Sequence, residues 1–139
     1  MSDQPSLTEM IDAIIKTFIV AHADDSDAHL AQALVYNAGR LAWRLREQGV
    51  DVSQKTDRAD VVTDADFAAE RFVAGVLEAL RGEDGIVGEE GANRESKSGR
   101  TWVIDPVDGT FNFASGFDYW CSALALTDAN GVILGAVHR

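Results

Sequence analysis

The stretch WVIDPVDGTFNF, residues 102–113, decides the fold of this chain. Its first three residues are apolar, which is typical of a buried strand, and we expect the strand to stop at Asp105 and to open there into a cleft. Pro106 cannot extend a central strand, and Gly109 permits backbone conformations that are closed to other residues. Asp105 and Asp108 are therefore expected to flank a turn, from which both carboxylates can point into one space.

Two acidic side chains that share one space need a positive partner. At an effective dielectric constant of about 20, two such charges ~4 Å apart repel by ~4 kcal/mol. Carboxylate and backbone carbonyl oxygens suit Mg²⁺, with Mn²⁺ as the alternative, and the stretch lacks the His and Cys side chains that zinc favours. Asp105 is also a candidate N-cap for the turn that follows it, but Asp108 and Glu89 as companions favour metal ligation.

A second pair of acidic residues precedes this stretch. Residues Gly85–Gly88 are predicted to form a short strand that delivers Glu89 and Glu90. Because successive side chains of a strand alternate between its faces, Glu90 is expected to point away from Glu89 and to be solvated or salt-bridged. The polar segment 92–100 is expected to be turn-like.

Apolar residues at helical spacing predict three helices farther upstream. A capping-box pattern that begins at Ser6 starts the first, which ends near His22. Its apolar face is expected to pack on the body of the chain or on a partner subunit. The second helix follows the acidic run 23–27 and stops at Gly49, and the third covers residues 63–81.

The remaining segments are predicted to be strands and loops. Residues 50–55 are expected to form a strand, and the mostly polar residues from Lys55 to Asp60 a loop. Residues 119–127 and 132–137 are expected to form two strands joined by a hairpin turn rich in Asp, Asn and Gly. Helices that cover a mixed sheet, with the site at the strand ends, make this an α/β layered fold.

The composition indicates one globular unit. With 139 residues, of which 46% are hydrophobic, the chain is long enough to bury a core. The 12 Lys and Arg against 23 Asp and Glu give a formal net charge of -11, which repels nucleic acid and anionic membranes. A phosphate-bearing substrate would therefore need metal ions as its positive partner.

The lone cysteine favours a reducing compartment. Cys121 permits no internal disulfide, and we expect it to be a small apolar core residue of a strand rather than a nucleophile, because no His is near it in sequence. No apolar run approaches the ~20 residues of a membrane span, and the N-terminus lacks a signal pattern. These features predict a cytoplasmic protein without a membrane segment.

Three motifs follow one another along the chain: K-x-x-x-x-D-x-V-T-x-A-D over residues 55–66, G-E-E-G over 88–91 and D-P-V-D-G-T-x-N-F over 105–113. In this order they resemble the inositol monophosphatase family of metal-dependent, lithium-sensitive phosphatases. The resemblance implies the layered αβαβα sandwich of that family, and it starts at the second helix. Residues 1–24 are therefore expected to be an N-terminal helical extension, and residues 25–139 the N-terminal, metal-binding part of the family's domain.

The resemblance also assigns a metal site. By it, Asp105 bridges two metal ions, Glu89 and the backbone carbonyl of Val107 complete the first, and Asp108 serves the second. Family members run to nearly twice this length, and their remaining part normally includes a W-D motif whose aspartate completes the site. Family members are often dimers, so the resemblance includes a homodimer among the partners.

Residues around the metal site receive roles in binding and catalysis. Gly109 and Thr110 come just before a predicted helical turn, so their N–H groups can bind a phosphate oxygen or form a plain turn. The resemblance makes Asp66 the partner of Thr110 in orienting and deprotonating the attacking water. Asp66 has a structural alternative, since with Thr63 as N-cap it would occupy the third helical position and satisfy free N–H groups there.

Two residues of the predicted loop keep the spacing of a pair in the family. Lys55 and Asp60 are expected to assist a weakly held third metal, and solvated loop charges are the equal alternative.

The motifs together predict an Mg²⁺-dependent phosphate monoester hydrolase that works by attack of a metal-activated water. Its expected substrate is myo-inositol 1-phosphate or a similar small polyol phosphate. Histidinol phosphate, fructose 1,6-bisphosphate and adenosine 3',5'-bisphosphate fit the motifs almost as well. The alternative is a non-catalytic fragment or regulatory metal-binding half that needs a C-terminal partner, with an exposed edge at the strand ending at Val137 as its mark.

Overall fold

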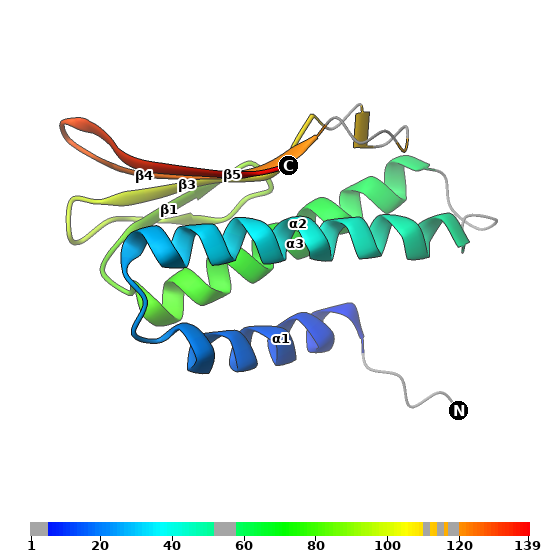
Figure 1. Ribbon diagram of the computed structural model, residues 1–139, viewed down its shortest axis with the longest axis horizontal. Helices are drawn as coiled ribbons and strands as arrows, with labels where there is room; N and C mark the ends of the chain where they lie inside the picture. Colours follow the sequence, from blue (N-terminus) through cyan, green and yellow to red (C-terminus); the bar gives the residue numbers. More distant parts are fainter. Residues whose placement is uncertain (1–5, 52–57, 110–111, 114–115, 117–119) are drawn as a thin grey trace.

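The computed structural model describes residues 6–51, 58–109, 112–113, 116 and 120–139. Figure 1 shows three layers: a sheet, a pair of long helices that cover one of its faces, and a further helix behind them. The elements in chain order are α1 (Leu7–His22), α2 (Asp27–Asp51), α3 (Arg58–Leu80), β1 (Gly85–Gly88), β2 (Asn93–Arg94), β3 (Thr101–Asp108), β4 (Cys121–Asp128) and β5 (Gly131–His138). Of these helices, none is both long enough and apolar enough to cross a membrane.

The strands form one mixed sheet in the order β2-β1-β3-β4-β5. β1 runs parallel to β3, and the other neighbours are antiparallel. The predicted α/β layered fold is confirmed, with the apolar start of the quoted stretch in the central strand. The short β2 lies within the segment 92–100, which the sequence predicted to be turn-like.

The central strand β3 does not stop at Asp105, as the sequence predicted, but continues to Asp108. Its pairing with β4 shifts register between these two aspartates, so that β3 carries one more residue there than β4. Such a bulge tolerates Pro106, because the bulged residues leave the regular hydrogen-bond ladder, and β1 has already ended opposite Ile104. The predicted turn between the two acids is therefore a β-bulge.

Two helix boundaries differ from the prediction. α2 continues through Gly49 to Asp51, so the predicted strand over residues 50–55 is wrong at its start, and its remainder lies outside the described residues. A glycine inside a helix costs only about 1 kcal/mol relative to alanine, which tertiary packing easily offsets. α3 begins at Arg58 rather than Thr63, so Asp60 belongs to a helix and Thr63 is not an N-cap.

The hairpin of β4 and β5 confirms the predicted turn chemistry. The Asp128 carboxylate accepts a hydrogen bond from the Asn130 backbone N–H at 2.8 Å. Gly131 has a φ of 119°, in the left-handed region that L side chains rarely adopt. β5 then forms one edge of the sheet.

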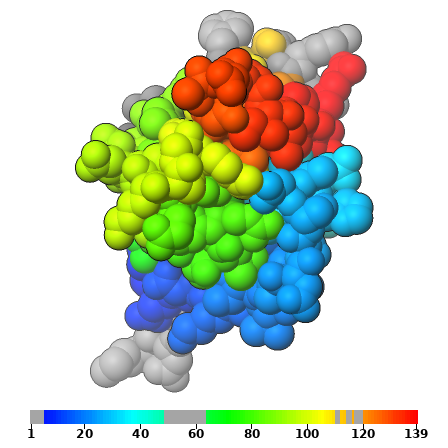
Figure 2. All heavy atoms as spheres, turned by 90° about the vertical axis from the view of Figure 1, so that its left-hand side faces the viewer, coloured from blue at the N-terminus to red at the C-terminus, as the bar shows by residue number. Residues whose placement is uncertain are grey.

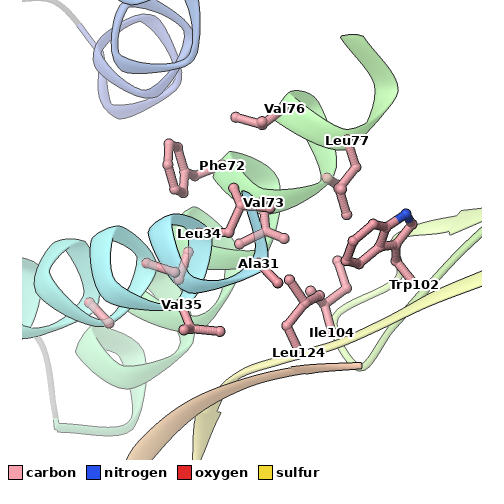
Figure 3. Close-up of a cluster of buried hydrophobic side chains, with 14 of the residues drawn as sticks. Ala31, Leu34, Val35, Phe72, Val73, Val76, Leu77, Trp102, Ile104 and Leu124 are labelled. Atoms are coloured by element: carbon pink, nitrogen blue, oxygen red, sulfur yellow. The ribbon is translucent and has the colours of Figure 1, made fainter. Parts of the chain in front are cut away.

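The core lies between the sheet and the long helices. In Figure 3, Trp102 and Ile104 of β3 point from the sheet toward Val73 and Leu77 of α3. All four side chains are buried, and Trp102 is fully so. Burial of such large apolar side chains contributes about 1.5–3 kcal/mol each, which explains why the apolar start of the quoted stretch organises the sheet.

Helix α1 forms an outer layer on α3. Ser6 caps it, because its Oγ accepts a hydrogen bond from the Glu9 N–H at 3.1 Å, as the capping pattern predicted. Ile11 and Phe18 are buried, and the Phe18 ring meets the edge of Phe72 on α3 with centroids 5.2 Å apart. Figure 2 shows α1 in blue on the side of the helices away from the sheet. Its apolar face thus packs on the body of the chain.

A buried carboxylate ties the end of the sheet remote from Asp105 to the helices. Asp84 accepts hydrogen bonds from the Trp102 Nε1–H at 3.0 Å, from the Ser98 hydroxyl at 2.6 Å and from the Arg100 guanidinium at 3.2 Å. The same guanidinium forms an ion pair with Asp27 at the start of α2, 3.0 Å away. No local sequence pattern indicates this network, because its members come from separate segments of the chain.

Replacement of Asp84 by alanine is expected to lower the free energy of unfolding by about 3 kcal/mol, because the buried Trp102 N–H loses its acceptor and Arg100 loses one of its two carboxylate partners. Urea denaturation measures the change. The control Asp24→Ala removes an exposed carboxylate and should stay within about 0.5 kcal/mol of wild type. Equal stabilities of the two variants would contradict the role given to Asp84.

Candidate active site

A small cleft lies where the described chain brings the ends of β1 and β3 close to α3. It is lined by Asp66, Glu89, Glu90, Asp105, Pro106 and Val107. Four of these six residues are acidic, and three of the four were named from the sequence as site residues. The structure therefore gathers the acids of three separate motifs in one place.

The bulge in β3 explains how two aspartates spaced three apart can share a side of the sheet. Asp105 pairs with Ala123 and Asp108 with Cys121, and these two residues of β4 are two positions apart. Residues two apart in a strand lie on one face, so their partners Asp105 and Asp108 lie on one face as well. The expectation that both acids face one space holds, but a bulge rather than a turn achieves it.

Glu89 and Glu90 follow β1 in a turn, not in the strand itself. The alternation of strand side chains therefore does not apply to them, and the prediction that Glu90 points away from Glu89 is wrong, since both line one cleft. Glu90 is half-buried and lines the cleft together with the more exposed Glu89. Among the described residues, no salt bridge involves Glu90.

Asp66 lies well inside α3 and not in its first turn, so its predicted structural role beside an N-cap is wrong. Only 9% of the residue is exposed, and its Oδ1 atom has no hydrogen-bond partner. Burial raises the pKa of Asp66 to about 7, and the negative charges of Glu90 and Asp105 contribute further. Burial likewise raises the pKa of Asp105 to about 6, with Glu89 and Asp108 as the next causes.

The donor chemistry of the cleft fits a hard divalent cation. Carboxylate oxygens crowd together, one of them is buried without a partner, and each acid makes its neighbours harder to ionise. The described part of the chain nevertheless contains no group of three or more His, Cys, Asp or Glu side chains arranged to hold a metal ion. The acids thus gather without forming a closed coordination shell.

Asp108 and Gly109 line a neighbouring hollow with Trp120 and Cys121. Asp108 is exposed, and its Oδ2 lies 3.9 Å from the Cys121 Sγ. Cys121 begins β4 but is only half-buried, so the prediction of a core residue is wrong. Burial, Asp108 and Asp105 raise the pKa of its thiol, which disfavours a thiolate nucleophile.

Asn112 and Phe113 are helical, as the predicted helical turn requires. Gly109 has a φ of 95°, and its carbonyl accepts a hydrogen bond from the Phe113 N–H at 3.0 Å. Thr110 lies outside the described residues, as does Lys55. Asp60 lies in the first turn of α3, so the predicted loop that paired it with Lys55 is wrong at this position.

Two residues that the sequence analysis missed support the site. Glu70 of α3 is buried and accepts hydrogen bonds from the N–H groups of Glu90 and Ala92. Arg46 of α2 is buried, donates to the Phe113 carbonyl at 3.3 Å and lies over the ring of that residue. The four-residue spacing from Asp66, which places Glu70 on the same face of α3, was the available signal for Glu70.

Comparisons with known proteins agree with this geometry. A family model described as the inositol monophosphatase family matches residues 24–139. The histidinol-phosphatase of Mycobacterium tuberculosis is 39% identical over 113 residues, which cover 80% of this chain and 43% of that protein. The inositol-1-monophosphatase of Rhizobium meliloti is 40% identical over 106 residues, which cover 74% of this chain and 39% of that protein.

The crystal structure of inositol monophosphatase-II from Staphylococcus aureus matches with a TM-score of 0.67 at 28% identity, over 80% of this chain and 40% of that one. The chain therefore spans about two fifths of the length of these three proteins.

The raised pKa of Asp66 predicts how stability changes with pH when no metal is bound. The folded chain holds this proton up to about pH 7, whereas an unfolded aspartate loses it near its ordinary pKa of 3.8. The wild-type chain in chelator should therefore lose stability as the pH rises through this window. Asp66→Asn removes the contribution of Asp66, so at pH 7 its free energy of unfolding should exceed that of wild type by about 1–2 kcal/mol.

Denaturant titrations between pH 4 and pH 7 test this prediction, and the gap between variant and wild type should close at the acid end. Asp64→Asn is the matched control, because it removes an exposed carboxylate two residues away on the same helix. Parallel pH profiles of Asp66→Asn and wild type would contradict the prediction.

Proposed function

The chain belongs to the inositol monophosphatase family, and from that premise we propose that it is the metal-binding part of an Mg²⁺-dependent phosphatase for small phosphate monoesters. The observation that carries the proposal is the cleft in which Asp66 meets acids from two other elements, with a buried carboxylate oxygen that has no partner. Such a cluster is stabilised by a divalent cation and would bind a phosphate group through it.

The residues proposed to hold the metal are Glu89, Asp105, Asp108 and the backbone carbonyl of Val107. Bound Mg²⁺, or Mn²⁺ in its place, would supply the positive charge that makes a water more acidic and that stabilises the leaving oxygen. Asp66 orients the attacking water and accepts its proton, a role that suits a buried carboxyl group whose pKa is raised to about 7.

Gly109 and Thr110 are proposed to bind a phosphate oxygen through their backbone N–H groups, with Thr110 as the second residue that orients the water. The positive φ of Gly109 and the helical hydrogen bond from the Phe113 N–H support such a turn at this point.

For the substrate we propose myo-inositol 1-phosphate or a similar small polyol phosphate. The relatives carry different names, histidinol-phosphatase and inositol-1-monophosphatase among them, and they are about equally similar to this chain. Histidinol phosphate is therefore the second substrate to test, followed by fructose 1,6-bisphosphate and adenosine 3',5'-bisphosphate.

We further propose that residues 1–24 are an extension of the family's domain and residues 25–139 its metal-binding part. The family model begins to match at residue 24, and α1 packs on α3 without contributing an acid to the cleft.

Phosphate release from these substrates by the full chain, with and without Mg²⁺, tests the proposal. Release should require Mg²⁺ and fall when lithium is added. Asp105→Asn and Asp66→Asn should each reduce it at least about 100-fold, because one loses a metal ligand and the other the proton acceptor. Asp64→Asn should release phosphate at the wild-type rate, and metal-independent release would overturn the proposal.

A second candidate function is favoured by the uncovered face of the sheet. Val87 of β1 pairs with Val103 of β3, and both side chains are exposed on the face away from the helices. Val137 of the edge strand β5 is 68% exposed. Within the described part of the chain, an exposed apolar face and an edge strand of this kind suit a metal-binding half that becomes active only with a C-terminal partner.

Mixing this chain with the part of the Staphylococcus aureus inositol monophosphatase-II that it does not match tests the second candidate. The melting temperature should rise by about 5 °C or more, and self-association of the chain should cease. The double substitution Val103→Lys and Val137→Lys should prevent both the rise in melting temperature and the loss of self-association. An active, monomeric chain without any partner would exclude this function.

A further inference from the structure

We propose that Glu70 of α3 is a positioning residue that holds the Glu89–Glu90 turn against α3, so that the turn faces Asp66 and Asp105. What the turn does there, namely ligation of a metal ion, rests on the proposed function. That Glu70 holds the turn rests on contacts within the described chain and can be tested separately.

In the described part of the chain, the Glu70 carboxylate accepts hydrogen bonds from backbone N–H groups of the turn. Its two oxygens accept hydrogen bonds from the Glu90 N–H at 2.9 and 3.1 Å, and its Oε2 also accepts one from the Ala92 N–H at 2.9 Å. The residue is only 3% exposed. Hydrogen bonds to an ionised acceptor are about twice as strong as neutral ones, so the turn is held firmly at both of its sides.

The Glu70 carboxylate packs directly against Gly88, where a side chain would otherwise lie. A Cβ atom added to Gly88 would overlap the carboxyl oxygens and carbon of Glu70, which are its nearest neighbours. A larger residue at this position would therefore displace the Glu70 carboxylate from its place. The glycine before the turn and the acid on the helix form one fitted contact, 18 residues apart in sequence.

The position of Glu70 couples the turn to the proposed proton acceptor. Asp66 and Glu70 are four residues apart on α3, so one face of one rigid helix carries both. The distance between the turn and Asp66 is then set by α3 rather than by the loops that flank the turn. The proposed metal ligand Glu89 lies next to a residue whose backbone Glu70 holds.

Stability alone does not account for an acid at this position. Glu70 adds a negative charge to a cleft that already contains the acids of the site, and its charge raises the pKa of Asp66, Asp105 and Glu90. The three N–H contacts, however, need two acceptor oxygens close together. A carboxylate offers both, whereas the amide of glutamine offers one oxygen and presents an NH₂ group to the remaining donor.

The experiment compares Glu70→Gln with wild type in the full chain. Amide hydrogen exchange of Glu90 and Ala92, followed by NMR, should become at least about tenfold faster, while the amides of Trp102 and Leu124 in the sheet keep their rates. The dissociation constant for Mn²⁺ should rise about tenfold, as is typical when a residue that orients a metal ligand is lost. At saturating metal, kcat should recover toward that of wild type.

Two further variants separate position from charge. Gly88→Ala keeps the charge of Glu70 but displaces its carboxylate, so it should reproduce both the faster exchange and the weaker Mn²⁺ binding. Glu78→Gln removes the same charge from an exposed site on the same helix and should change neither.

Unchanged exchange at Glu90 and Ala92 in both Glu70→Gln and Gly88→Ala would overturn the proposal. Faster exchange with unchanged Mn²⁺ binding would overturn it as well, because the turn would then be held without consequence for the site. If wild type neither binds Mn²⁺ nor hydrolyses phosphate monoesters, the proposed function fails, and the exchange rates alone decide whether Glu70 holds the turn.

Discussion

The extra residue that β3 carries between Asp105 and Asp108 is the constraint on which the site depends. β1 ends opposite Ile104, and from there β3 runs on beside β4 alone. The chain after β1 turns toward α3 instead of following β3, because its N–H groups bind Glu70. The cleft lies where the two strands part, so the bulge and the turn together create it.

The same arrangement leaves the site electrostatically unfavourable without a cation. Burial and neighbouring charges raise the pKa of both Asp66 and Asp105, which means that folding works against their ionisation. The buried carboxylate of Asp84, at the other end of the sheet, has three hydrogen-bond donors, one of which is the Arg100 guanidinium. The satisfied carboxylate thus lies at one end of the sheet, and the acids whose ionisation is disfavoured lie at the other.

Much of this architecture could be predicted from short-range patterns. The apolar residues before Asp105 predicted the central strand, and the turn residues at 128–131 predicted the hairpin, because both signals are local. The bulge could not be predicted, since the D-P-V-D sequence suits a turn as well, and only the register against Cys121 and Ala123 distinguishes the two. The hydrogen-bond partners of Glu70 and Asp84 could not be predicted for a related reason: they lie 14 to 22 residues away, although the four-residue spacing from Asp66 does place Glu70 on the face of Asp66.

Helix α3 carries residues of the site and also packs on α1. Asp66 lines the cleft, and Glu70 lies one turn farther along the same face of α3. Phe72 packs against Phe18 of α1. A helix that is packed on two sides is held in place, so it can keep two acidic side chains at a fixed distance from each other. The N-terminal helix therefore supports the site indirectly, because it packs on the helix that carries both the proposed proton acceptor and the residue that positions the acidic turn.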